Sequence, residues 1–118
     1  MKKSFSTIVC ILIVSLNLYA QFQEANNGIN HGYIMAFAID GSTNTLYTGT
    51  YGRGIYKSTD SGNQWTAAHN GLEGDFSFIT ALLFTGGNLF AGTESEGVLF
   101  SANGGSSWTQ VIKGLTTT

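Results

Sequence analysis

The chain has 118 residues, which is enough for one small domain. Only 10% of the residues are charged, Gly occurs 16 times and Pro is absent, which is typical of a turn-rich β protein and excludes a charged disordered tail. The net charge is -2 and no stretch is rich in Lys or Arg, so the sequence does not favour nucleic-acid binding.

The first twenty residues differ from the rest of the chain. Lys2 and Lys3 precede the apolar run Ile8–Leu18, and Ala20 precedes Gln21. This layout predicts a helical secretory signal peptide over residues 1–20. A membrane anchor is the alternative, but the apolar run is shorter than the roughly 20 residues of a typical spanning helix. We therefore expect a protein that is secreted, periplasmic or on the cell surface, with no stable membrane anchor after signal removal.

Loss of the signal peptide would change the chemistry of the chain. Cys10 is the only cysteine and lies inside the apolar run, so the mature chain could form no disulfide and no cysteine metal site. Lys2 and Lys3 would leave with it and no acidic residue would, so the net charge would move from -2 to -4.

The remaining chain contains a repeat. The octet STDSGNQW (58–65) returns 43 residues later as SANGGSSW (101–108), and LYTGT and GIYKS return at the same spacing as LFAGT and GVLFS. Gly28, Gly71 and Gly114 continue this register. The sequence thus divides into a signal peptide (1–20), a leader (21–27), two repeats (28–70 and 71–113) and the start of a third repeat (114–118).

Each repeat predicts four short strands separated by Gly, Asn, Ser and Asp. The first strand is an unbroken apolar run, 33–39 or 78–84, which matches best at a spacing of 45 because the following turn is longer in the first repeat. The other strands are expected at 45–50, 54–59 and from Trp65, and at 88–93, 97–102 and from Trp108. An unbroken apolar strand needs cover on both faces. Stacked four-stranded sheets with a period of about 40–45 residues predict the blades of a β-propeller.

The octet lies between the third and fourth strands, so it is expected to be a turn. It resembles the Asp-box, or bacterial neuraminidase repeat, written S-x-D-x-G-x-x-W, and the chain is most similar to secreted bacterial propellers like the photosystem II stability and assembly factor. The first box matches fully, and the second has Asn in place of Asp. The resemblance implies an all-β fold of two antiparallel blades of an incomplete propeller. It also implies a structural role for eight residues: Ser58, Asp60, Gly62, Trp65, Ser101, Asn103, Gly105 and Trp108.

Loop tips generally attract function, so the loops after the second strands are the candidate binding site. Their residues are Tyr51, Arg53, Glu94 and Glu96. The three arginines that the resemblance leads one to expect of a sialidase are absent, because Arg53 is the only arginine. The loop acids, Asp40, Asp75, Glu94 and Glu96, show no spacing that pairs them as a glycosidase requires. His31 and His69 have no metal-ligand spacing, so we expect no metal and no cofactor.

Two function classes remain. The first is a secreted, non-catalytic propeller module that binds a protein or glycan or supports assembly. The alternative is a fragment of a sialidase of the neuraminidase-repeat type, or of another glycoside hydrolase, with its catalytic residues in missing blades. Propellers close with about 4–8 blades, so two repeats need further blades of the same chain or self-association to close the ring. The sequence stops inside a repeat, which favours the interpretation as a fragment. Two repeats alone should be marginally stable, aggregate or oligomerise.

Overall fold

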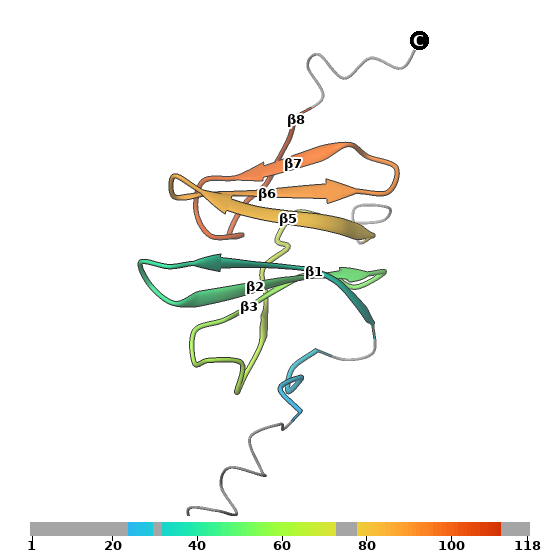
Figure 1. Cartoon of the computed structure of the whole chain (residues 1–118). Coiled ribbons are helices and arrows are strands. Elements are labelled where there is room, and N and C mark those ends of the chain that lie inside the picture. The colour runs from blue at the N-terminus through green and yellow to red at the C-terminus, as the bar shows by residue number, and fades with distance from the viewer. Residues whose placement is uncertain (1–23, 30–31, 73–77, 112–118) are drawn as a thin grey trace, which may run out of the picture.

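The computed structural model describes residues 24–29, 32–72 and 78–111, and this part of the chain is all-β. It forms two four-stranded antiparallel sheets, each with its strands in sequence order (Figure 1). The predicted fold class is confirmed for the two sheets. The predicted signal peptide and the start of a third repeat lie outside the described residues. Within the described residues, no helix is long and apolar enough to cross a membrane.

Sheet 1 consists of β1 (Tyr33–Asp40), β2 (Thr45–Tyr51), β3 (Gly54–Ser58) and β4 (Thr66–Ala67). Sheet 2 consists of β5 (Ile79–Thr85), β6 (Asn88–Thr93), β7 (Val98–Ser101) and β8 (Thr109–Val111). These bounds lie close to the predicted ones. The prediction that the fourth strand begins at each Trp was wrong by one residue, since β4 begins at Thr66 and β8 at Thr109. The Trp65 N–H donates to the carbonyl oxygen of Asn27 at 2.8 Å instead of pairing with β3.

The two sheets share their irregularities as well as their strands. The ladder between the first two strands shifts register between Ile34 and Ala36 in sheet 1 and between Ile79 and Ala81 in sheet 2. The β5–β6 hairpin is closed by Gly86 and Gly87, both at positive φ, as a two-residue hairpin loop requires. Four residues, 41–44, make the corresponding loop in sheet 1. This difference accounts for the spacing of 45 in the first strands and 43 elsewhere.

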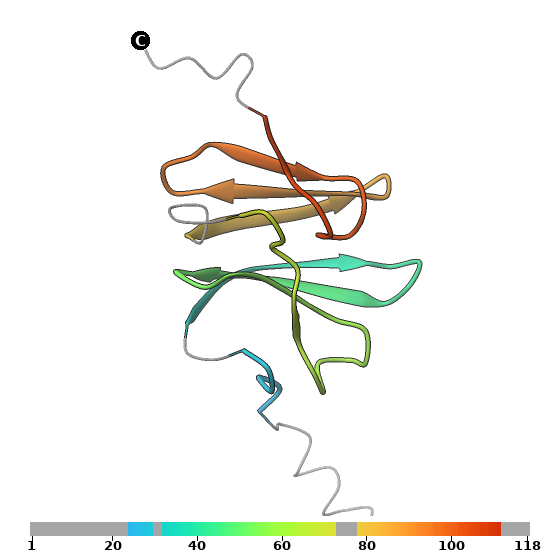
Figure 2. The same ribbon diagram turned by 180° about the vertical axis from the view of Figure 1, so that it is seen from behind.

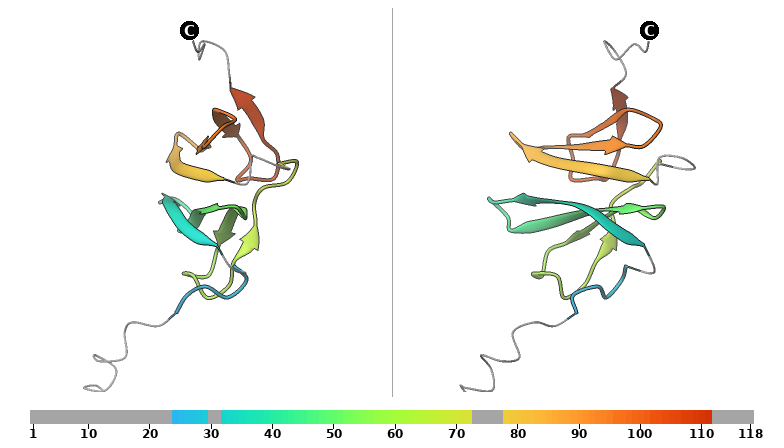
Figure 3. Two further views of the ribbon diagram at one scale, coloured as in Figure 1. Left: turned by 90° about the vertical axis from the view of Figure 1, so that its right-hand side faces the viewer. Right: turned by 45° about the vertical axis from the view of Figure 1, so that its right-hand side comes forward.

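The sheets stack face to face, and the core lies between them (Figures 1 and 2). β1 and β5 lie at one edge of the stack, and β4 and β8 lie towards the other (Figure 3). Five buried side chains form the core cluster, with Leu72, Leu82 and Trp108 packed against it. They are Ile55, Ala68, Ile79, Ala91 and Leu99. Burial of this apolar surface is the main stabilising term between the sheets.

The first strand of sheet 1 is covered on one face only. Ala36 and Ala38 alternate with larger side chains and face sheet 2, where they are half-buried. The large side chains of the other face remain exposed: Ile34 (41%), Phe37 (63%) and Ile39 (55%). The expectation that both faces of this strand are covered is therefore not met within the described residues, because no second sheet lies on that side.

Candidate functional site

The turn between β3 and β4 is held by hydrogen bonds from its own Ser and Asp. The Ser58 hydroxyl donates to Asp60 Oδ1 at 2.8 Å and accepts from the Gly62 N–H at 2.9 Å. The Gln64 N–H donates to the same Asp60 oxygen at 2.9 Å. These bonds from Gln64 and Ser58 stabilise the ionised form and hold the pKa of Asp60 below its ordinary value. Asp60 is thus engaged by its own turn.

The turn between β7 and β8 has the same bonds although it carries Asn. The Ser101 hydroxyl donates to Asn103 Oδ1 at 2.9 Å and accepts from the Gly105 N–H at 2.9 Å. The Ser107 N–H donates to Asn103 Oδ1 at 2.9 Å, and the Asn103 amide donates in turn to the Ser107 hydroxyl at 2.7 Å. The neutral amide thus keeps the accepting role of Asp60 and adds one donor.

Each turn is also tied to the segment that precedes its own sheet. The Trp108 indole donates to the carbonyl oxygen of Ala68, and the Trp65 indole donates to that of Ala25. Ala25 precedes Ala68 by the 43-residue spacing of the repeat. Both segments also form the same kind of turn. The Ile29 N–H donates to the backbone carbonyl oxygen of Asn26, and the Leu72 N–H donates to that of His69. The likeness between repeats therefore begins before Gly28, inside the predicted leader.

The two candidate loops meet at one end of the sheets. The hydroxyl of Tyr51, the last residue of β2 and not a loop residue as predicted, donates to Glu94 Oε2, from the loop after β6, at 2.8 Å. The Tyr51 ring also meets the Phe78 ring edge to face, with centroids 4.8 Å apart. The bond to Glu94 raises the pKa of Tyr51, with smaller contributions from desolvation and from the Glu94 charge. Two predicted site residues, one from each sheet, therefore form one feature.

Arg53 and Glu96 occupy equivalent positions in the two loops. The Arg53 N–H donates to the Thr50 hydroxyl at 3.1 Å, and the Glu96 N–H donates to the Thr93 hydroxyl at 2.9 Å. The carbonyl oxygen of Glu96 also accepts from the Gln110 side chain at 2.7 Å. Fixed backbones at both positions give the loop end a defined shape, with Arg53 on one loop and Glu94 and Glu96 on the other.

Sequence reasoning missed two aromatic residues at this end. Tyr33 pairs with Tyr51 in the β1–β2 ladder, and its side chain is 80% exposed. Phe78 forms an isolated bridge with Tyr51 and contacts its ring. Both residues begin an apolar run, so the sequence marked them only as strand positions. Each of the two apolar runs begins with an aromatic residue, and this shared position is the signal that could have identified them.

The other titratable candidates have structural partners. Asp40 accepts from the Ser42 and Thr43 hydroxyls at 2.7 and 2.8 Å, and these bonds keep its pKa below the ordinary value. His69 Nδ1 lies 2.8 Å from the carbonyl oxygen of Ile55, and its ring meets the edge of Tyr56. His31 and Asp75 lie outside the described residues. In the described part of the chain, no three His, Cys, Asp or Glu side chains gather as metal ligands would.

Comparison with known proteins supports the fold alone. No protein-family model and no curated protein sequence matches the chain. The structure is similar to the computationally designed Ika4 protein, with a TM-score of 0.56 and 22% identity over 75% of this chain and 52% of that one. It also aligns with the GH74 xyloglucanase from Xanthomonas campestris, with a TM-score of 0.48 and 23% identity over 64% and 14% of the respective chains. The chain thus spans about half of the length of Ika4. With its stacked four-stranded antiparallel sheets, the fold is β-propeller-like.

Proposed function

We propose that the chain is a non-catalytic repeat module of an Asp-box β-propeller that binds a protein or a glycan at the loops following β2 and β6. The observation that carries the proposal is the hydrogen bond between Tyr51 and Glu94, which joins the two sheets at an exposed end. Tyr33 adds a second exposed aromatic ring beside it. Tyrosine offers both an apolar ring and a polar tip, which suits recognition at a partly wet surface.

The Asp-box part of the proposal is supported by the bonding of both turns. Ser58 and Asp60 hold the first turn, and Ser101 and Asn103 hold the second with the same set of bonds. In each octet, the Ser, the Gly and the Asp or Asn are thus used to stabilise the turn itself. A non-catalytic role is favoured because Asp40 and Asp60 are engaged by their own turns and Glu94 is engaged by Tyr51.

Binding is tested with the purified chain on arrays of glycans and of extracellular proteins. Tyr51→Ala and Glu94→Ala should each weaken binding of a captured ligand at least about tenfold, since each removes one partner of the loop-end feature. Asp40→Ala is the matched control, because Asp40 lies at the opposite end of β1 and should leave binding unchanged. Unchanged binding by both loop variants would refute the site. Hydrolysis of a bound glycan by the chain would instead favour the glycoside hydrolase alternative.

Export completes the proposal, with the mature chain secreted, periplasmic or on the cell surface. It is supported by Lys2 and Lys3, by the apolar run that follows them, and by Ala20 before the expected cleavage site. Sequencing the N-terminus of material from a secreting host should give a chain that begins near Gln21. Soluble cytoplasmic protein with Met1 intact would contradict export without affecting the proposed binding site.

A further inference from the structure

The contact between the two sheets depends on one glycine. A Cβ atom added to Gly49 in β2 would overlap the side chain of Ile79 in β5, and it would also lie 3.4 Å from Leu82. Beside this point, Tyr47 stacks on Phe84 with ring centroids 5.9 Å apart and ring planes within 9°. Sheet 2 thus inserts an isoleucine into a slot on sheet 1 and lays an aromatic ring next to it.

The outer face of sheet 2 has the same slot. Gly92 in β6 pairs with Ala81 in β5, just as Gly49 in β2 pairs with Ala36 in β1. Phe90 in β6 is in the same way equivalent to Tyr47 in β2. A Cβ atom added to Gly92 would have Ala81 and Thr80 as its nearest neighbours, and both belong to β5 of the same sheet. No side chain from another layer of the described structure occupies this slot.

The outer face of sheet 1 has the matching projections. Ile34 in β1 is equivalent to Ile79 in β5, because they pair with Thr50 and Thr93 in their ladders. Ile39 is likewise equivalent to Phe84, because they pair with Leu46 and Leu89. The two sets differ in burial, because Ile79 is fully buried whereas Ile34 and Ile39 are 41% and 55% exposed. One chain therefore carries both halves of a single contact, on opposite faces.

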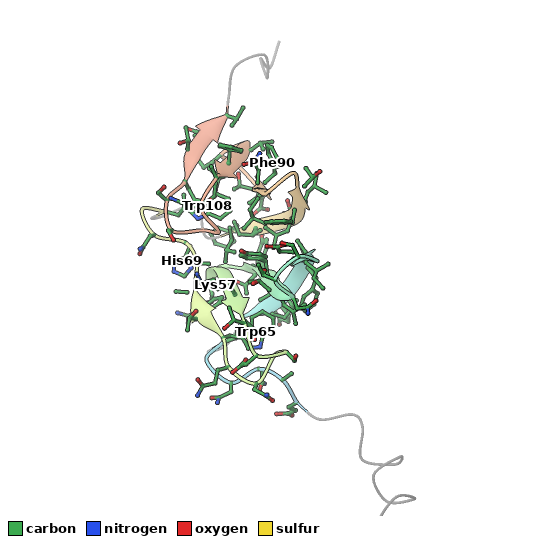
Figure 4. The ribbon with its side chains drawn as sticks, turned by 90° about the vertical axis from the view of Figure 1, so that its left-hand side faces the viewer. Lys57, Trp65, His69, Phe90 and Trp108 are labelled. Atoms are coloured by element: carbon green, nitrogen blue, oxygen red, sulfur yellow. The ribbon has the colours of Figure 1, made fainter. Side chains whose placement is uncertain are left out.

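The outer face of sheet 2 is also more apolar than the equivalent face of sheet 1, which sheet 2 covers. On the outer face of sheet 2, Phe100 pairs with Phe90, and their ring centroids lie 5.2 Å apart. At the equivalent position of sheet 1, Lys57 pairs with Tyr47. Leu83 on the same face is 57% exposed. Figure 4 shows Phe90 on the side of sheet 2 remote from sheet 1, and Trp65 on the far side of sheet 1. The two ends of the stack thus present apolar surfaces of complementary shape.

We infer that the outer face of sheet 1 docks on the outer face of sheet 2 of a second copy of this chain. Ile34 of one copy enters the Gly92 slot of the next, and Ile39 packs on Phe90, so each contact between copies repeats the contact seen within one copy. Such a contact is heterologous, and it forms a closed ring if the rotation between sheets closes. This self-association goes beyond the proposed binding function and does not depend on it.

Sedimentation velocity of the purified chain over a range of concentrations tests the inference. We expect a discrete assembly of about two to four copies, because each copy brings two sheets and propellers close with about 4–8 blades. Gly92→Leu fills the slot and Ile34→Asp places a charge on the projection, so each variant should sediment as a monomer. Gly41→Ala is the control, since a Cβ atom there meets nothing within 4 Å. Circular dichroism verifies that each variant is folded, and Leu83→Asp replaces Gly92→Leu if that variant is not.

Mixing the two monomeric variants gives the sharpest test. Gly92→Leu retains an intact Ile34 projection and Ile34→Asp retains an intact Gly92 slot, so the mixture should form a 1:1 dimer that cannot grow further. A mixture that stays monomeric would overturn the inference, because an isologous contact or unspecific association predicts no such complementation. A wild-type chain that is monomeric at every concentration would also overturn it, as expected if further blades of the same polypeptide cover both faces.

Discussion

The indole nitrogen of Trp108 donates a hydrogen bond to the carbonyl oxygen of Ala68 at 2.8 Å, and this bond ties the last turn of sheet 2 to the segment that leaves sheet 1. Trp65 makes the equivalent bond to Ala25. Figure 4 shows Trp108 near His69, between the two sheets. Each of these turns therefore does more than close a hairpin, because its Trp also fixes the chain that precedes its own sheet.

Replacing Trp65 tests this role. The ring is 6% exposed, and it lies 6.5 Å from the Phe37 ring, measured between centroids. We expect Trp65→Ala to lower the free energy of unfolding by about 3–5 kcal/mol, because a large buried ring leaves a cavity. Urea unfolding at one fixed protein concentration measures the change. Trp65→Phe keeps a ring and loses only the indole donor, so it should cost less. A loss below about 1 kcal/mol for Trp65→Ala would mean that the ring carries little of the packing.

Acid should weaken the turn between β3 and β4 and spare the turn between β7 and β8. Asp60 is held below its ordinary pKa of 3.8 by bonds to Gln64 and Ser58, so its stabilising contribution is present above that value. The contribution is lost as the pH falls through the folded-state pKa. Asn103 does not titrate. Hydrogen exchange at acid pH should therefore show loss of protection at the Gln64 amide before the Ser107 amide, and Asp60→Asn should remove the difference. Asp40, which also has a lowered pKa, lies at the end of β1, outside both turns, so Asp40→Asn is the control. Equal loss at both amides would contradict the prediction.

The strands and turns could be predicted because the information for them is local. Gly86 and Gly87 mark a two-residue hairpin loop, and the alternation of apolar runs with Gly, Asn and Asp separates the strands. The spacing of 43 residues then predicts that both sheets are alike. The bond from Trp65 to Ala25 could not be predicted in this way, since a backbone carbonyl leaves no mark in the sequence.

The candidate site was only partly accessible to the same reasoning. Tyr51 and Glu94 were predicted as loop residues in equivalent positions, but their hydrogen bond depends on how far apart the sheets stack. The role of Gly49 was hidden for the same reason. A glycine in a strand indicates a close approach, but only the structure shows that Ile79 makes that approach.

The bond between Tyr51 and Glu94 has a spectroscopic consequence. The bond, desolvation and the Glu94 charge all raise the pKa of Tyr51 above 10.0. Glu94→Ala removes the bond and the charge, so one of the five tyrosines should titrate at lower pH in ultraviolet absorbance. Glu96→Ala, two residues away, should leave the titration curve unchanged. Identical curves for the wild type and Glu94→Ala would show that the bond does not persist in solution.

The slot at Gly49 offers the most direct measurement of how tightly the two sheets of one chain pack. Gly49→Ala places a methyl group against Ile79, which is fully buried, so the sheets must separate or the isoleucine must leave its rotamer. Overpacking of this kind costs about 1–3 kcal/mol. Gly41→Ala, in open space, should change the free energy of unfolding by less than about 0.5 kcal/mol.

A double-mutant cycle separates this clash from an intrinsic effect of alanine in the strand. Ile79→Ala alone should cost about 2–5 kcal/mol, because it leaves a cavity between the sheets. In the double variant, the methyl group that Gly49→Ala introduces occupies part of that cavity and meets no isoleucine. The cost of the double variant should therefore fall short of the sum of the two single costs, with a coupling of about 0.5–3 kcal/mol, as for residues in contact. Additive costs in urea unfolding would mean that Gly49 and Ile79 do not touch and that the two sheets stack in another register.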